Sequence, residues 1–201
     1  MKAEPKYRNV VSSDAKELSK IESHIFTMDN LKTNFKDEIR KESKKIFVCT
    51  IEKRKKSQGK FNTLIKKIYT LFSKTKNDLN INSDFYELII GYAKIWTILD
   101  EIHIEQIGVI DTYRKQGIGE KLFLLCVKYS IENGSKKMLL ECRNSNIAAI
   151  NLYKKYLFKI TSIRKNYYPY KNSREDAICF ESPEIQKTFY KKLIYTKKNY
   201  I

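Results

Sequence analysis

The order of strand-like and helix-like segments in residues 85–181 most constrains the fold. Residues 85–99 are predicted as a long strand. After a turn at Asp100 and Glu101, Ile102 and Ile104 alternate with polar residues, so residues 85–110 predict an antiparallel hairpin. The segments after it are predicted as helix, strand, helix, strand and strand, at residues 118–133, 137–143, 146–156, 158–168 and 175–181. Because strand–helix–strand connections favour parallel pairing, we expect an α/β fold: a mixed sheet with helices on both faces.

The first half of the chain adds a shorter set of elements. Residues 6–11 and 45–51 are rich in strand-forming residues, and apolar residues at helical spacing predict helices over 15–25 and 31–39. A loop that holds Pro169 is expected between the last two strands.

Two stretches concentrate positive charge in a chain whose net charge is +17. Residues 52–80 include nine basic and two acidic residues, and residues 184–201 include five basic residues and one acidic residue. We therefore expect one domain over 1–183, interrupted by a Lys-rich insertion at 52–83 and followed by a basic tail at 184–201. Because Lys dominates and Arg is the better bidentate phosphate reader, we interpret both stretches as solvated appendages. Contact with ribosomal RNA remains the alternative.

Composition excludes several classes of protein. Hydrophobic residues make up 42% of the chain, which is enough for a core and excludes wholesale disorder. There is no apolar run of 18 residues and no convincing presequence, so we expect a monomeric cytoplasmic protein, with an organellar location left open. Four cysteines are widely spaced and there are two histidines, which predicts buried free thiols and no metal site. The cysteines are Cys49, Cys126, Cys142 and Cys179.

A glycine-rich turn is the strongest local signal. Three of the six glycines, Gly108, Gly117 and Gly119, fall within twelve residues, and residues 114–119 read RKQGIG between a strand and a helix. The exposed N–H groups and the helix dipole favour a phosphate or pyrophosphate there. The spacing fits neither the dinucleotide fingerprint nor the P-loop, which leaves coenzyme A as the expected ligand.

Three motifs in order carry a resemblance to a known family. Residues 107–119 (IGVIDTYRKQGIG) resemble the acetyl-CoA motif of the GNAT acetyltransferases, and residues 141–153 (ECRNSNIAAINLY) resemble the block that follows it. Residues 164–169 (RKNYYP), followed by 175–177 (EDA), are similar to the RimI type, the ribosomal-protein-alanine N-acetyltransferases. The similarity is dense over 85–183 and gives nothing for 52–83.

The resemblance implies a role for each matching residue. Glu141 would be the general base, Tyr153 the proton donor to the departing thiolate, and Asn146 a ligand of the pantetheine arm. Tyr167 and Tyr168 would wall the acceptor groove. The remaining residues would bind acetyl-CoA, with no metal involved: Ile107, Gly108, Val109, Arg114, Lys115, Gln116, Gly117, Ile118, Gly119 and Glu120.

Simpler interpretations stand beside these roles. Glu141 could form a salt bridge with Arg143 or a lysine, Asn146 could cap a helix, and Tyr153 could be a core residue. Glu105 and His103 are rival bases. Cys142 alternates with apolar residues and is expected to pack in the core rather than act as a nucleophile. Glu120 is acidic and should point away from a phosphate, Gly108 suits a β-bulge, and Leu157 stands where the family usually has glycine.

The expected activity is transfer of an acetyl group from acetyl-CoA to the N-terminal α-amine of a protein. By resemblance the acceptor is the N-terminal alanine of a small-subunit ribosomal protein. Two alternatives stay open: a broader N-terminal or lysine acetyltransferase, and a ribosome- or RNA-binding protein with a vestigial acetyltransferase fold.

Overall fold

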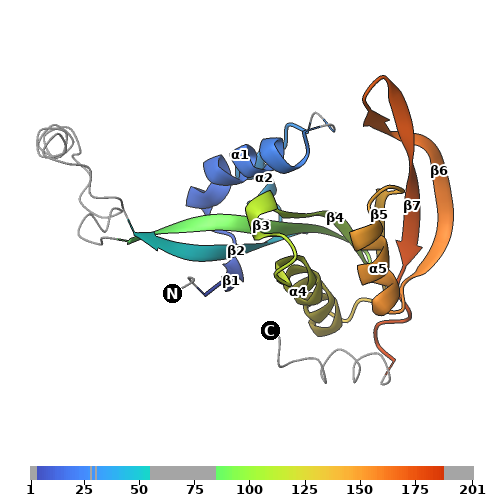
Figure 1. Ribbon diagram of the computed structural model, residues 1–201. Helices are drawn as coiled ribbons and strands as arrows, with labels where there is room; N and C mark the ends of the chain where they lie inside the picture. The colour runs from blue at the N-terminus through green and yellow to red at the C-terminus, as the bar shows by residue number, and fades with distance from the viewer. Residues whose placement is uncertain (1–3, 28, 30, 55–84, 188–201) are drawn as a thin grey trace, which may run out of the picture. The chain divides into compact units, whose positions relative to one another are not determined.

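The computed structural model describes residues 4–27, 29, 31–54 and 85–187 (Figure 1). Backbone contacts divide the chain into two units, one with residues 1–4 and 51–88 and one with residues 5–50 and 89–201. The described parts of the first unit are mainly the ends of two strands, residues 51–54 and 85–88. The second unit carries the site. Most of the predicted insertion and tail lies outside the described residues. So does the short basic helix that the spacing of Leu64, Ile68 and Leu71 predicts.

Seven strands form one mixed sheet in the order β1-β2-β3-β4-β5-β7-β6. They are β1 (Lys6–Asn9), β2 (Lys44–Arg54), β3 (Phe85–Ile98), β4 (Glu101–Val109), β5 (Lys137–Arg143), β6 (Lys159–Tyr170) and β7 (Ser173–Glu181). The predicted hairpin is present as β3 and β4, and β4 pairs in parallel with β5. The α/β class with a mixed sheet is confirmed.

Two sequence-based expectations for the C-terminal strands were wrong. Parallel pairing was expected to continue from β5 to the next strand along the chain, but β7 inserts between β5 and β6 and pairs antiparallel with both. β6 and β7 follow each other in the chain, so they can pair locally as an antiparallel hairpin. If β6 paired with β5 instead, β7 would be left outside this pairing. Pro169 lies within β6 opposite Arg174, not in a loop; β6 is an edge strand, where the missing N–H of proline costs no ladder bond.

The helices cover both faces of the sheet (Figure 1). They are α1 (Ala15–Ile25), α2 (Phe35–Glu38), α4 (Ile118–Glu132) and α5 (Ile147–Lys155). The two N-terminal helices lie on one face and α4 lies on the other, with α5 beside it. The predicted helix over 31–39 is shorter than expected, because only one turn is helical there.

A hydrophobic cluster lies on each side of the sheet. Leu18, Phe35 and Tyr92 are fully buried between α1, α2 and the sheet. On the other side, Phe123 of α4 contacts the rings of Tyr153 and Tyr156 at centroid distances of 5.6 and 5.2 Å. Three of the four cysteines are buried and all four are free, as expected, while Cys179 is partly exposed.

β4 contains a β-bulge, which shifts the alternation of its side chains between the α1 face and the opposite face of the sheet. Lys94 pairs with Gln106, but the next residue of β3, Ile95, pairs with Ile104, so Glu105 is the extra residue. The bulge was expected at Gly108 and lies three residues earlier. Gly108 serves packing instead, because a Cβ there would lie 3.1 Å from Ile25 and 3.2 Å from Phe26 at the end of α1.

Candidate active site

The turn over residues 114–119 presents a concave row of backbone N–H groups. Lys115 and Gly117 both have left-handed backbone conformations, with φ of 59° and 78°, and Gly117 is the N-cap of α4. Among the described residues, none accepts a hydrogen bond from the N–H groups of 115–119. Left- and right-handed residues in succession point their N–H groups into one concavity, which is suited to an anion.

Glycine at position 119 is not explained by the protein's own packing. A Cβ there would meet only Val109 Cγ2 within 4 Å, at 3.8 Å, an ordinary contact. The residue lies in the first turn of α4, where glycine lowers helix stability relative to alanine. Close approach of a ligand to the backbone accounts for glycine at this position.

Some side chains of the turn contact other parts of the protein, and others are exposed to solvent. Arg114 pairs with Asp111 at 2.7 Å and donates from Nε to the Val109 carbonyl at 3.1 Å, so it braces the turn. Lys115 and Gln116 are exposed. Glu120 points toward α5, where it accepts a hydrogen bond from Lys155 at 2.7 Å, as expected for an acidic residue beside an anion site.

The strands β4 and β5 stop pairing just before the predicted pantetheine segment. Their pairing ends at Ile104↔Leu140, while β4 continues to pair with β3 as far as Gly91↔Val109. The edge of β4 that carries Ile107 and Val109 is therefore not in the β5 ladder, and an extended amide-bearing ligand could hydrogen-bond along it.

Glu141 lies on β5 one residue beyond the last pair. Its side chain is 27% exposed and forms an ion pair with Arg164 on β6 at 3.1 Å. It also hydrogen-bonds with Tyr167, and this bond raises the pKa of the Tyr167 phenol. A salt bridge was considered possible, but its partner is Arg164 and not Arg143. The carboxylate still reaches the surface of the site.

Arg143 is the centre of a network that the sequence did not predict. Its guanidinium bonds Asp29 after α1, the Pro169 carbonyl at 2.9 Å, and Glu175 at 3.3 Å. It also lies 4.6 Å from the centroid of the Tyr168 ring. One side chain thus ties the end of α1 to the β6–β7 hairpin. The alternation along the strand predicted that Arg143 shares a face with Glu141. Nothing in the sequence indicated that Asp29 would be a partner of Arg143.

Tyr153 and Asn146 lie on or beside α5. Asn146 caps the helix by accepting a hydrogen bond from the Ala149 N–H at 3.2 Å, as expected. Tyr153 is 6% exposed, and burial raises the pKa of its hydroxyl, which stays protonated at neutral pH. No described residue hydrogen-bonds that hydroxyl. Tyr153 packs against Phe180, which is paired with Leu140, so Tyr153 and Glu141 lie on opposite faces of β5.

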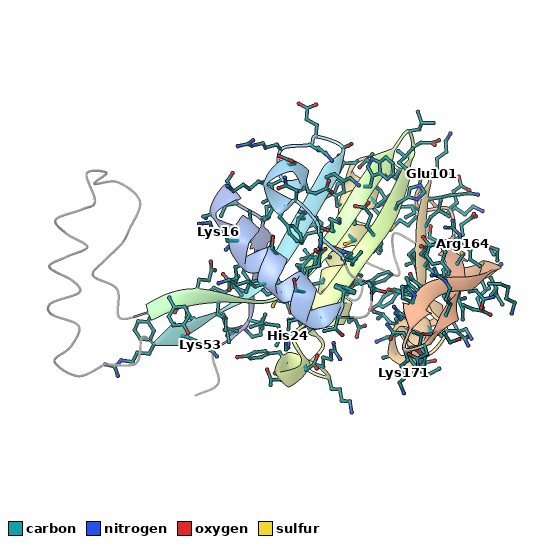
Figure 2. The ribbon with its side chains drawn as sticks, turned by 90° about the horizontal axis from the view of Figure 1, so that it is seen from above. Lys16, His24, Lys53, Glu101, Arg164 and Lys171 are labelled. Carbon is teal, nitrogen blue, oxygen red and sulfur yellow. The ribbon has the colours of Figure 1, made fainter. Side chains whose placement is uncertain are left out.

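Tyr167 and Tyr168 lie next to each other on β6, with ring centroids 5.0 Å apart at a steep angle. A register shift between Arg164 and Tyr168, with Asn166 at a φ of 52°, turns this part of the strand. Arg164 and Lys171 mark the hairpin in Figure 2. Burial and the charge of Glu141 raise the pKa of Tyr168.

The rival catalytic residues are engaged elsewhere. Glu105 pairs with Lys44 at 2.6 Å, and His103 lies 3.4 Å from Glu101. Cys142 is buried, as predicted, and burial raises the pKa of its thiol to about 12, which suits a core residue and not a nucleophile.

The part of the chain that is described holds no cluster of three or more His, Cys, Asp or Glu side chains arranged to bind a metal ion. No helix there has the length and apolar character needed to cross a membrane.

Comparison with known proteins bears on this site. The model of the acetyltransferase (GNAT) family matches residues 65–157, beginning inside the predicted insertion. A [ribosomal protein bS18]-alanine N-acetyltransferase of Salmonella typhimurium is 32% identical over 105 residues, which are 52% of this chain and 71% of the relative. The chain belongs to the GNAT family of acetyltransferases.

Other members are similar over shorter stretches. A putative [ribosomal protein bS18]-alanine N-acetyltransferase of Bacillus subtilis is 40% identical over 88 residues, 44% of this chain and 57% of that protein. The match thus spans little more than half of that relative.

The crystal structure of the ribosomal-protein-S18-alanine N-acetyltransferase from Escherichia coli has a TM-score of 0.66 at 24% identity, covering 90% of this chain and 94% of the other. This likeness confirms the GNAT fold.

Proposed function

We propose that this protein transfers the acetyl group of acetyl-CoA to the N-terminal α-amine of a protein. The observation that carries the proposal is the turn at residues 115–119. Its N–H groups have no acceptor among the described residues, and its Gly119 is unexplained by packing. The pyrophosphate of coenzyme A would accept from these N–H groups at the start of α4, where the helix dipole favours an anion. Exposed Lys115 and Gln116 would add contacts.

The rest of acetyl-CoA would follow the free edge of β4. The pantetheine amides would bond backbone groups of Ile107 and Val109, beyond the last β4–β5 pair. Asn146, at the start of α5, would contact the same arm. This path brings the thioester to the place where β4 and β5 diverge, which Glu141 and Tyr153 approach from opposite faces.

Glu141 would act as the base. Its carboxylate is partly exposed and belongs to a network with Arg164 and Tyr167, which orients it. It would accept the proton of the acceptor ammonium, directly or through water, and the neutral amine would attack the thioester carbonyl. A backbone N–H near Val109 would stabilise the oxyanion that forms.

Tyr153 would donate the proton that the departing thiolate needs. Burial raises the pKa of its hydroxyl, so the hydroxyl carries its proton at neutral pH. No described residue competes for that proton. The ring is held by Phe123 and by Phe180, whose centroid is 5.6 Å away, so the donor is fixed in place.

An α-amine is easier for this base to deprotonate than a lysine amine. Its pKa is about 8, against about 10.4 for lysine, so freeing a lysine amine at neutral pH costs about 3 kcal/mol more. The similarity to [ribosomal protein bS18]-alanine N-acetyltransferases supports the N-terminal alanine of a small-subunit ribosomal protein as the acceptor. Tyr167 and Tyr168 would line its groove.

Mass spectrometry tests the proposal. The protein and acetyl-CoA are incubated with a peptide that begins with alanine and contains an internal lysine, and the acetyl group is located by fragmentation. We expect it on the α-amine. Transfer to lysine alone would favour a lysine acetyltransferase, and no transfer together with no acetyl-CoA binding would overturn the proposal.

The base is tested separately with Glu141→Gln. We expect turnover to fall by about 100-fold with acetyl-CoA affinity unchanged, because a general base contributes about 10²–10⁴-fold. Glu132→Gln is the matched control, since Glu132 pairs only weakly with Lys128, at 3.9 Å on the exposed side of α4. Unchanged turnover in Glu141→Gln would move the base to Glu105 or His103.

A further inference from the structure

A glutamate is buried in the face of α1 that packs on the sheet. Glu22 lies one turn after Leu18 and next to Ile21, within the stripe of buried residues of this helix, and it is 1% exposed. A glutamate is seldom buried to this degree, because its carboxyl group is costly to bury unless the oxygens accept hydrogen bonds. Nothing in the proposed reaction uses Glu22.

Both oxygens of Glu22 accept hydrogen bonds from distant parts of the chain. Oε2 accepts from the Thr33 N–H at 3.0 Å, and Oε1 accepts from the Thr33 hydroxyl at 2.5 Å. Oε1 also accepts from Nε2 of Gln106 at 2.8 Å. The Tyr92 hydroxyl donates to the other end of the Gln106 amide, its carbonyl oxygen, at 3.0 Å. One buried carboxyl group thus joins α1 to β4 and to the segment that precedes α2.

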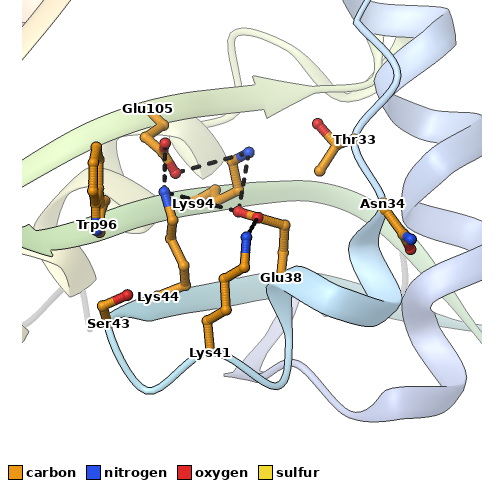
Figure 3. Close-up of a pocket in the computed structure, with 9 residues that line it drawn as sticks. All are labelled: Thr33, Asn34, Glu38, Lys41, Ser43, Lys44, Lys94, Trp96 and Glu105. Atoms are coloured by element: carbon orange, nitrogen blue, oxygen red, sulfur yellow. Dashed lines mark hydrogen bonds and ion pairs between the residues drawn. The ribbon is translucent and has the colours of Figure 1, made fainter.

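The segment between α1 and α2 is held near both of its ends. Asp29 bonds the guanidinium of Arg143 on β5. Thr33 gives both its backbone N–H and its hydroxyl to Glu22, so its backbone and its side chain are fixed by the same group. Thr33 also borders a pocket of about 400 Å³, whose charged side chains pair with one another (Figure 3).

This segment lies beside the proposed acceptor site. Arg143 and Glu141 are two residues apart on β5, so they share a face of the sheet. Burial is the main cause of the raised pKa of Tyr168, and the charges of Glu141 and Asp29 add to it, so both carboxylates lie near this phenol. An acceptor whose amine reaches Glu141 would therefore have the Asp29 end of the segment as one wall and the β6–β7 hairpin as another.

A wall of this kind depends on its anchors. Residues 31–34 are neither helical nor part of the sheet. Ordering such residues costs conformational entropy, which the hydrogen bonds at the ends of the segment offset. A wall that is already in place does not have to be ordered when the acceptor arrives, and the acceptor then binds more tightly.

We propose that Glu22 is a positioning residue for the acceptor: through Thr33 and Gln106 it holds the segment between α1 and α2 in place as a wall of the acceptor site. The inference rests on the proposed function, because it takes Glu141 as the place where the amine reacts. Glu22 acts through its two partners and contacts neither substrate. Its contribution is to acceptor binding and not to the chemical step.

Steady-state kinetics with an alanine-first peptide test this inference. Thr33→Val removes one hydrogen bond to Glu22 and keeps the size of the side chain. We expect the KM for the peptide to rise by about fivefold, with kcat and the KM for acetyl-CoA unchanged. A hydrogen bond is worth about that factor in an equilibrium, and apparent affinity falls with the fraction of molecules whose wall is in place. Thr33→Ser keeps the hydroxyl and should keep the wild-type KM.

Glu22→Met tests the same anchor more severely. It removes every acceptor oxygen and should raise the KM for the peptide beyond the value in Thr33→Val. Hydrogen exchange supplies a second readout, since the Thr33 amide loses its acceptor in this variant and should exchange faster. Unchanged exchange at Thr33 would overturn the inference. If Glu22→Met fails to fold, Thr33→Val decides the question.

Ser182→Ala is the matched control for a general loss of stability. Ser182 is 5% exposed, and its hydroxyl accepts from the Met138 N–H at 2.9 Å near the start of β5. This variant also removes one buried hydroxyl, so its Tm should fall about as much as that of Thr33→Val. Its peptide KM should stay at the wild-type value. An equal rise in peptide KM in both variants would trace the effect to stability and overturn the inference.

The two proposals fail differently. If the wild-type protein acetylates no peptide, the proposed function is wrong and this inference falls with it. If the wild type acetylates the peptide and Thr33→Val has the same peptide KM, the function stands and this inference alone is overturned. A change confined to kcat or to the KM for acetyl-CoA would place the effect of Glu22 away from the acceptor and would overturn the inference as well.

Discussion

Replacing Arg143 with methionine should destabilise the protein by about 3 kcal/mol. The substitution keeps an apolar stem of similar length and removes every donor of the guanidinium. It leaves the carboxylates of Asp29 and Glu175 behind, which are only 14% and 13% exposed. Breaking a buried pair costs about 3–5 kcal/mol, and the residual exposure of this network places the value at the lower end.

Thermal unfolding measures this loss. For a chain of this size, about 3 kcal/mol corresponds to a fall in Tm of about 8 °C. The matched control is Lys165→Met on the same hairpin, whose side chain is 76% exposed and pairs with Asp176 at 2.8 Å. Its Tm should change by less than about 2 °C, because exposed ion pairs contribute little.

The pH dependence supplies a second readout. Burial acts to raise the pKa of Glu175, but hydrogen bonds from Ser145 and Arg143 reverse this, so the pKa lies below its ordinary value of 4.5. A lowered pKa contributes stability that is present above that ordinary value and is lost as the pH falls through the folded-state pKa. The difference in Tm between wild type and Arg143→Met should therefore narrow below about pH 4.5.

Two results would refute this reasoning. A variant that melts within about 2 °C of wild type at pH 7 would mean that Arg143 does not anchor the hairpin. A difference that stays constant from pH 7 to pH 3.5 would mean that the loss arises from packing and not from the stranded carboxylates. Because the network reaches the hairpin that carries Tyr168, we also expect a higher KM for the peptide and an unchanged KM for acetyl-CoA.

Three other substitutions have defined outcomes. Gly117→Ala should weaken acetyl-CoA binding in calorimetry, while Gly134→Ala should cost similar stability without this effect; both glycines have left-handed φ, of 78° and 70°, and open space around them. Equal acetyl-CoA affinity in the two variants would contradict binding of the pyrophosphate at the turn of residues 115–119. Leu157→Gly should raise Tm by about 2 °C, because Leu157 follows the C-cap of α5 with a φ of 66°, where a side chain is strained; a lower Tm would contradict this. Tyr153→Phe should lower kcat by about 100-fold with acetyl-CoA affinity retained, and unchanged kcat would remove its role as proton donor.

The glycine turn, the alternation of β5 and the cap of α5 could be predicted from the sequence because each depends on neighbouring residues. Residues 114–119 stand between a strand and a helix in the chain itself, and a strand of period two places Glu141 and Arg143 on one face whatever surrounds it. Asn146 bonds a backbone group three residues away. Local geometry of this kind is present in the sequence before any tertiary contact forms.

Only the tertiary structure decided which partners these residues have. Arg164 pairs with Glu141 because β7 inserts between β5 and β6 and an irregular β6 turns back toward the site, and Asp29 reaches Arg143 across 114 positions of the chain. The ion pairs among Glu38, Lys44, Lys94 and Glu105 join side chains from four segments that meet only in the folded sheet (Figure 3). Long-range pairing is set by the total packing of the core and not by any short stretch of residues, so such partners cannot be deduced from one sequence.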